Sequence, residues 1–146
     1  MTYRLAPRFK LGIEWNPEAD SASALANWLA VSEKKSRPAL ILGTSSDRIG
    51  TPEGQAYYAT LSKDLSALTG WPLSPYAGVS YGTFEDKLRA IGGVYVRFPE
   101  TNFASTLIYD GVNLHPTLQY SFGNRHVLTL LWVDTRDLGL SYSVAF

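Results

Sequence analysis

The feature that most constrains this chain is an alternation of large apolar residues with small or polar ones, repeated along most of its length. The segment 137–146 shows it most clearly. One set of alternate positions there is large and apolar: Leu138, Leu140, Tyr142, Val144 and Phe146. The positions between them hold Asp, Gly, Ser, Ser and Ala. Since a β-strand turns successive side chains to opposite faces, this period of two predicts strands whose two faces meet different surroundings.

Turn-forming residues divide the alternating runs at intervals typical of an antiparallel all-β meander. Gly123-Asn124 and Asp110-Gly111 are examples of such connections. The predicted strands cover 7–15, 38–46, 55–64, 75–84, 88–98, 103–110, 115–122, 126–134 and 137–146. The strand at 126–134 is apolar on both faces, so the pattern does not assign its sides.

Two segments are compatible with both helix and strand. In 21–35, Ala22, Leu25 and Trp28 have helical spacing, but a strand at 27–34 fits equally well. The segment 51–70 begins like a helix at Thr51-Pro52-Glu53, yet 56–61 alternates, and strand is favoured because its neighbours are strands. We therefore expect eight to ten strands, with one short helix in 21–35 or 51–70 as the alternative. An even count, as such barrels require, favours either a strand in 21–35 or a helix in 51–70.

Composition limits the classes of function. A chain of 146 residues suits a single domain covering 1–146, and thirteen basic residues balance thirteen acidic ones. This balance argues against nucleic acid as a partner, because a phosphate-binding surface needs clustered excess cations. Without cysteine there is no disulfide or thiolate metal site. The apolar runs are too short for a transmembrane helix, and no signal peptide is recognised.

The composition of the two strand faces indicates where the chain resides. The polar face is mostly Gly, Ser and Thr, whereas the apolar face is wide and carries aromatic residues near strand ends: Trp15, Phe98, Phe122, Trp132 and Phe146. A barrel in lipid places its apolar side chains outside and small polar ones inside, with aromatic girdles at the two interfaces. The pattern predicts a closed antiparallel up-and-down transmembrane β-barrel, since an unpaired edge in hydrocarbon is costly. The alternatives are a soluble β-barrel or sandwich with the same apolar face as its core, and a mixed α+β fold.

The C-terminal segment Gly139–Phe146 resembles the last strand of bacterial outer-membrane β-barrels, which ends in Phe and often has Tyr near the fifth position from the end. The length matches small eight-stranded barrels of the OmpA and OmpX type. The resemblance implies a place in the Gram-negative outer membrane, with a lipid bilayer or detergent around a monomer. It also implies recognition by the barrel-assembly machinery through Tyr142, Val144 and Phe146.

Charged residues on the small face are expected to point into the barrel. They are Arg8, Lys10, Glu14, Arg89, Arg97 and Asp110. Because buried charges must be paired and hydrogen-bonded, we expect a charge network that closes the narrow lumen. A small selective pore is the alternative.

Motifs for catalysis and cofactors are weak. The run Gly78-Val79-Ser80-Tyr81-Gly82 matches a nucleophile elbow in form, but that motif needs a strand–turn–helix context, and 75–84 is expected to be one strand. An outer-membrane enzyme acting on lipid would draw on a set of polar residues: Ser80, Asp110, His115, Ser121 and His126. The two histidines lack metal-ligand spacing. Asp47, in the turn-like run 45–50, could bind calcium, but a solvated loop is favoured. There is no nucleotide motif, so no cofactor is expected.

These features predict a small outer-membrane barrel with a structural, envelope or interaction role and no catalysis. A soluble β-barrel that binds an apolar small molecule is the second hypothesis. The lipid-modifying enzyme is the third.

Overall fold

The fold is one antiparallel sheet in which each strand pairs with the next one along the chain. The computed structural model describes residues 2–16, 21–48, 51–123, 125–133 and 137–144. In chain order the elements are β1 (Thr2–Ala6), β2 (Phe9–Asn16), β3 (Ser21–Val31), β4 (Ala39–Ser46), β5 (Gln55–Ser62), α1 (Ser66–Thr69), β6 (Leu73–Gly82), β7 (Lys87–Arg97), β8 (Phe103–Tyr109), β9 (Leu114–Phe122), β10 (His126–Val133) and β11 (Asp137–Val144). The sheet order follows this sequence from β1 to β11. The predicted all-β, up-and-down antiparallel arrangement is confirmed.

The ambiguous segments resolve in favour of strands. Residues 21–31 form β3, which pairs with β2 over eight positions, from Phe9↔Trp28 to Asn16↔Ser21. Residues 55–62 form β5, and helix in this region is limited to the single turn α1, which ends at Gly70 in the left-handed conformation with φ 73°. Strands β2 to β11 therefore comprise the nine predicted strands and β3. The short strand β1 was not predicted from the alternation. Within the described ranges no helix is long and apolar enough to cross a membrane.

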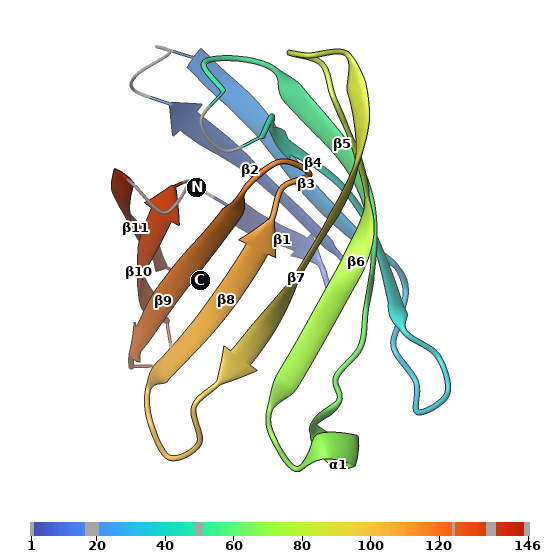
Figure 1. Cartoon of the computed structure of the whole chain (residues 1–146), viewed down its shortest axis with the longest axis vertical. Helices are drawn as coiled ribbons and strands as arrows, with labels where there is room; N and C mark the ends of the chain where they lie inside the picture. The colour runs from blue at the N-terminus through green and yellow to red at the C-terminus, as the bar shows by residue number, and fades with distance from the viewer. Residues whose placement is uncertain (1, 17–20, 49–50, 124, 134–136, 145–146) are drawn as a thin grey trace.

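The sheet curls strongly, but its first and last strands do not meet to close it (Figure 1). Among the described residues β1 pairs only with β2, and β11 pairs only with β10. The up-and-down sheet is therefore shown, but the expected closure into a barrel is not seen among the described residues. At the two edges, β1 has five residues with a register shift between Arg4 and Ala6, so it offers few ladder positions to the eight-residue β11.

The apolar face of the sheet is the convex, exposed one. Leu88, Leu138 and Leu140 expose 64–70 % of their surface, and Tyr142 exposes 56 %. The other face is concave and holds the most buried polar side chain, His115, which is fully buried. The sidedness predicted for 138–142 is confirmed; the side chains of Val144 and Phe146 lie outside the described residues.

The register assigns the two faces of β10, which the sequence left open. Thr129 lies opposite Gln119 of β9 and Ser141 of β11. Gln119 donates to the hydroxyl of Thr106 on the concave side, so Thr129 shares that side. Leu128 and Leu130 consequently belong to the convex face.

A close contact inside the curl predicts the effect of one substitution. The Tyr58 ring lies across Gly43, and its hydroxyl donates to Asn27 Oδ1 at 2.7 Å. A Cβ at Gly43 would lie 2.5 Å from Tyr58 Cζ and 2.6 Å from the backbone oxygen of Ala26. Gly43→Ala is therefore expected to lower the free energy of unfolding by about 1–3 kcal/mol, measured by denaturant titration.

Gly139 provides the matched control for this substitution. A Cβ there would have its nearest neighbour at 3.6 Å, which is ordinary van der Waals contact. Gly139→Ala should change stability by less than about 0.5 kcal/mol. Equal effects at the two glycines would contradict the packing described here.

Candidate functional site

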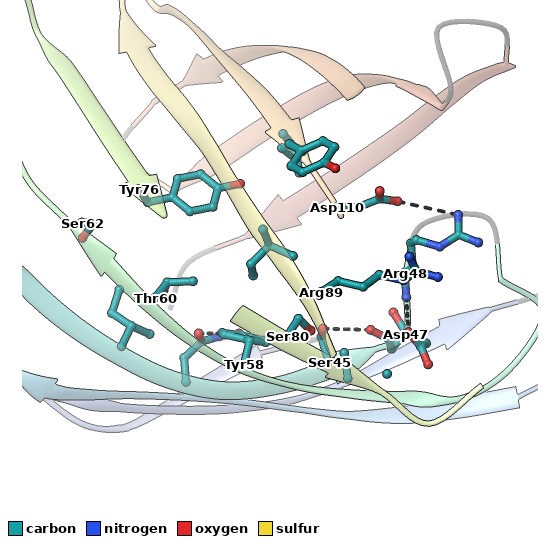
Figure 2. A pocket seen from close by; sticks show the side chains of 18 of the residues that line it. Ser45, Asp47, Arg48, Tyr58, Thr60, Ser62, Tyr76, Ser80, Arg89 and Asp110 are labelled. Atoms are coloured by element: carbon teal, nitrogen blue, oxygen red, sulfur yellow. Dashed lines mark hydrogen bonds and ion pairs between the residues drawn. The ribbon is translucent and has the colours of Figure 1, made fainter. Parts of the chain in front are cut away.

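The concave side of the sheet holds a cavity of about 620 Å³. Strands β3 to β8 and the segments that follow β4, β6 and β8 supply its walls (Figure 2). Charged side chains gather at the end where β4 and β8 finish, and hydroxyl-bearing and apolar side chains line the rest. This distribution separates the cavity into a charged end and an uncharged body.

Four side chains form the ion-pair network at the charged end. Arg48 Nη2 lies 3.3 Å from Glu85 Oε1, and Arg48 Nη1 lies 3.9 Å from Asp110 Oδ2. Arg89 pairs with the other oxygen of Glu85. Because Arg48 follows β4, Glu85 lies in the β6–β7 turn and Asp110 follows β8, the network ties three connections of the sheet together.

Asp110 is the most enclosed acid of this network, with 7 % of its side chain exposed. Its Oδ1 accepts the backbone N–H groups of Val112 at 2.9 Å and Asn113 at 2.8 Å. Its Oδ2 lies 3.0 Å from Nε2 of the buried His115. One carboxylate thus fixes the β8–β9 turn and joins it to the ion pairs.

Asp47 stabilises the neighbouring loop. Its two carboxylate oxygens accept the backbone N–H groups of Arg48 at 2.7 Å and Phe84 at 2.8 Å. The carboxylate lies against Gly82, where a Cβ would collide with it. Across the residues that the structure describes, no group of three or more His, Asp or Glu is placed to hold a metal ion.

The structure brings together two of the six residues predicted for the lumen network. Arg89 and Asp110 belong to it, whereas Arg8, Lys10 and Arg97 are exposed and make no ion pair with any described residue. These three lie toward the end of the sheet where β2 begins and β7 ends, opposite the end that holds Glu85 and Asp110. The side chain of Glu14 lies outside the described residues.

Arg48 and Glu85 belong to the network but were not among the lumen residues predicted from the sequence. Alternation assigns a face only to residues within strands, and both of these residues lie in connections. One signal was available in the sequence. Charged residues stand in turns next to strand ends, and inward-facing positions of the strands also carry charge, as at Arg89.

The residues considered for catalysis are divided between the two faces. Ser80 lines the cavity opposite Arg89, within β6 near its end, and the next element is strand β7, so the strand–turn–helix setting of a nucleophile elbow is absent there. His126 lies on the convex face, where its Nδ1 is 2.6 Å from the Tyr142 hydroxyl. Ser121 lies at the end of β9, where its N–H donates to the Asn102 carbonyl at 2.9 Å.

The network predicts that the stability of the folded protein depends on pH. The hydrogen bond from Arg89, with that from Arg48, holds the pKa of Glu85 below its usual range. A carboxyl with a lowered native pKa stabilises the folded state fully above its unfolded pKa of about 4.3, and this contribution is lost as the pH falls through the lower native value. The denaturant concentration at the unfolding midpoint should therefore decrease as the pH is lowered below about 5. Glu85→Gln should make that decrease smaller. An unchanged acid slope in the variant would contradict the ion pairing.

Searches against protein-family models, curated proteins and solved structures gave no match to this chain. The candidate site is thus defined by its own geometry: a hollow with a hydroxyl-rich wall, closed at one end by paired charges.

Proposed function

We propose that this chain is a small β-barrel of the bacterial outer membrane with a structural, envelope or interaction role. The supporting observation is the inverted distribution of side chains: large apolar residues cover the exposed convex face, and the polar ones line the concave side. Soluble monomers rarely expose contiguous apolar patches beyond a few hundred Å². In hydrocarbon the same surface is favourable, and the polar residues remain sheltered inside.

Aromatic side chains on the convex face support this proposal. At one end of the sheet they pack in contact, with ring centroids 4.8 Å apart for Phe103 and Tyr120 and 6.1 Å for Phe122 and Tyr142. Tyrosines occupy the other end: Tyr57, Tyr81 and Tyr109. Amphipathic rings at both ends of the strands fit the two interfaces of a bilayer. At about 3.4 Å per residue and a tilt of about 40°, a nine-residue strand such as β9 spans about 23 Å, close to the apolar band of such barrels.

Closure of the barrel is part of the proposal. The edges at β1 and β11 carry backbone groups that have no ladder partner among the described residues. Such groups are costly in hydrocarbon, at several kcal/mol each, so the bilayer favours pairing of the first and last strands. The C-terminal resemblance adds the barrel-assembly machinery as a partner, with Tyr142, Val144 and Phe146 as the recognised residues.

The charge network favours a structural role over transport. Arg48, Glu85, Arg89 and Asp110 lie across the charged end of the cavity and bind one another. A paired network at this position both obstructs the lumen and holds the connecting segments.

Electrophoresis in SDS tests the proposal. The detergent-folded protein should migrate differently before and after boiling, because a closed barrel resists unfolding until it is heated. The protein should also need detergent to stay monodisperse. A monodisperse monomer in plain buffer, with one mobility regardless of heating, would refute the membrane proposal and favour a soluble β-barrel.

A further inference from the structure

The body of the cavity is lined by hydroxyl groups that form no hydrogen bond with any residue the structure describes. They belong to six lining residues: Thr60, Ser62, Ser74, Tyr76, Ser80 and Tyr95. None of these hydroxyls hydrogen-bonds to another residue in the described ranges, whereas the nearby Tyr58 hydroxyl is bonded to Asn27. Figure 2 shows Tyr76, Thr60 and Ser62 arranged along the wall, with Ser80 nearer the charged end. Each hydroxyl can both donate and accept, so the wall offers hydrogen bonds of both kinds to a ligand.

Two tyrosine rings provide flat apolar surface beside these hydroxyls. Tyr58 lies against the backbone at Gly43, and Tyr76 lies against Gly93, where a Cβ would come within 2.7 Å of the ring. Both tyrosines line the cavity. Three isoleucines extend the apolar lining: Ile41, Ile91 and Ile108.

The charges of the cavity are largely committed to partners within the protein. The four network residues bind one another, and Asp47 is occupied by two backbone N–H groups. Lys87, at the rim, is exposed and makes no ion pair with a described residue. A charged ligand in the body of the cavity would have to compete with these pairs, but a neutral, hydroxyl-rich ligand would leave them intact.

We propose that the cavity binds a neutral saccharide. The sugar hydroxyls exchange hydrogen bonds with the free hydroxyls of the wall, and the C–H faces of the ring pack on Tyr58 and Tyr76. A volume of about 620 Å³ lies within the range of small-molecule sites and has room for about two sugar rings. The binding site uses the concave side alone, so it does not depend on membrane insertion.

Calorimetric titration with maltose, cellobiose and N,N′-diacetylchitobiose tests the proposal. The folded protein is kept in a zwitterionic detergent, because glycoside detergents carry the same head group as the ligand. At least one of these sugars should bind saturably, and glucuronate, glucosamine and decanoate should bind at least about tenfold more weakly. Saturable binding of the charged or alkyl probes alone, or of no probe, would overturn the proposal.

Two variants locate the binding within the cavity. Tyr76→Phe keeps the ring and removes a free hydroxyl, and Ser80→Ala removes another; each should weaken binding by about 2–10-fold, the contribution of one neutral hydrogen bond. Tyr120→Phe, on the exposed convex face, is the matched control and should leave affinity unchanged. Heat-dependent gel mobility and circular dichroism establish that each variant is folded. Equal affinity in all four proteins would exclude this cavity.

The outcomes separate this proposal from the membrane proposal. If the protein proves monodisperse in plain buffer, the same titration is made there, and sugar binding still supports the cavity site. If the protein is a heat-modifiable barrel that binds no sugar, the saccharide proposal alone is wrong.

Discussion

Replacing Leu118 by arginine is expected to lower the free energy of unfolding in lipid vesicles by about 2–4 kcal/mol. Leu118 lies midway along β9, four residues from each end, on the same face as the exposed Leu114 and Tyr120. Under the proposed membrane placement, that position faces the centre of the bilayer, where a guanidinium loses its hydration. Urea titration of the protein folded into vesicles measures the change.

Leu114→Arg is the control for depth. It changes the same residue type on the same face of the same strand, but at the strand end. Near the interface the arginine reaches water, and the expected loss is about 0–1 kcal/mol. Similar losses at 114 and 118 would contradict a bilayer around the convex face, because an aqueous surface has no such depth dependence.

Asp110→Ala is expected to lower the free energy of unfolding by about 3 kcal/mol. The substitution removes the acid that faces Arg48 and the fully buried His115, and it also removes the acceptor for two backbone N–H groups of the β8–β9 turn. Breaking a buried pair leaves its partners without compensation, which accounts for the size of the loss. Denaturant titration at neutral pH measures it.

Asp137→Ala is the matched control, since Asp137 is exposed at the start of β11 and forms no ion pair with a described residue. Its removal should change stability by less than about 0.5 kcal/mol. A loss at Asp110 no larger than that at Asp137 would show that the network does not hold the connections together.

The strand pattern was predictable because each face of this sheet meets a distinct environment. Alternation located nine of the strands, but it did not decide between helix and strand in 21–35, where Ala22, Leu25 and Trp28 also fit a helical spacing. Pairing settles that segment, because β3 forms ladders with both β2 and β4. Neither β1 nor the open state of the sheet is encoded in alternation, since both depend on which strands meet at the edges.

The candidate site was predictable only where it lies on strands. Arg89 was placed on the concave side by its position in β7, and Asp110 by its position directly after β8. Arg48 and Glu85 lie in connections, where no periodicity applies, and their pairing is known only in three dimensions. The free hydroxyls of Tyr76 and Ser80 were likewise invisible in the sequence, since a hydrogen-bond partner is known only in three dimensions.

Spin labels along β10 determine whether the convex face meets lipid, as proposed. The chain has no cysteine, so single cysteines at Leu128, Thr129, Leu130 and Leu131 provide unique labelling sites. If the convex face meets lipid, labels at 128 and 130 should collide with oxygen dissolved in the bilayer, whereas those at 129 and 131 should be shielded from it. Labels at 128 and 130 that collide instead with a water-soluble nickel chelate would contradict the proposed contact with lipid.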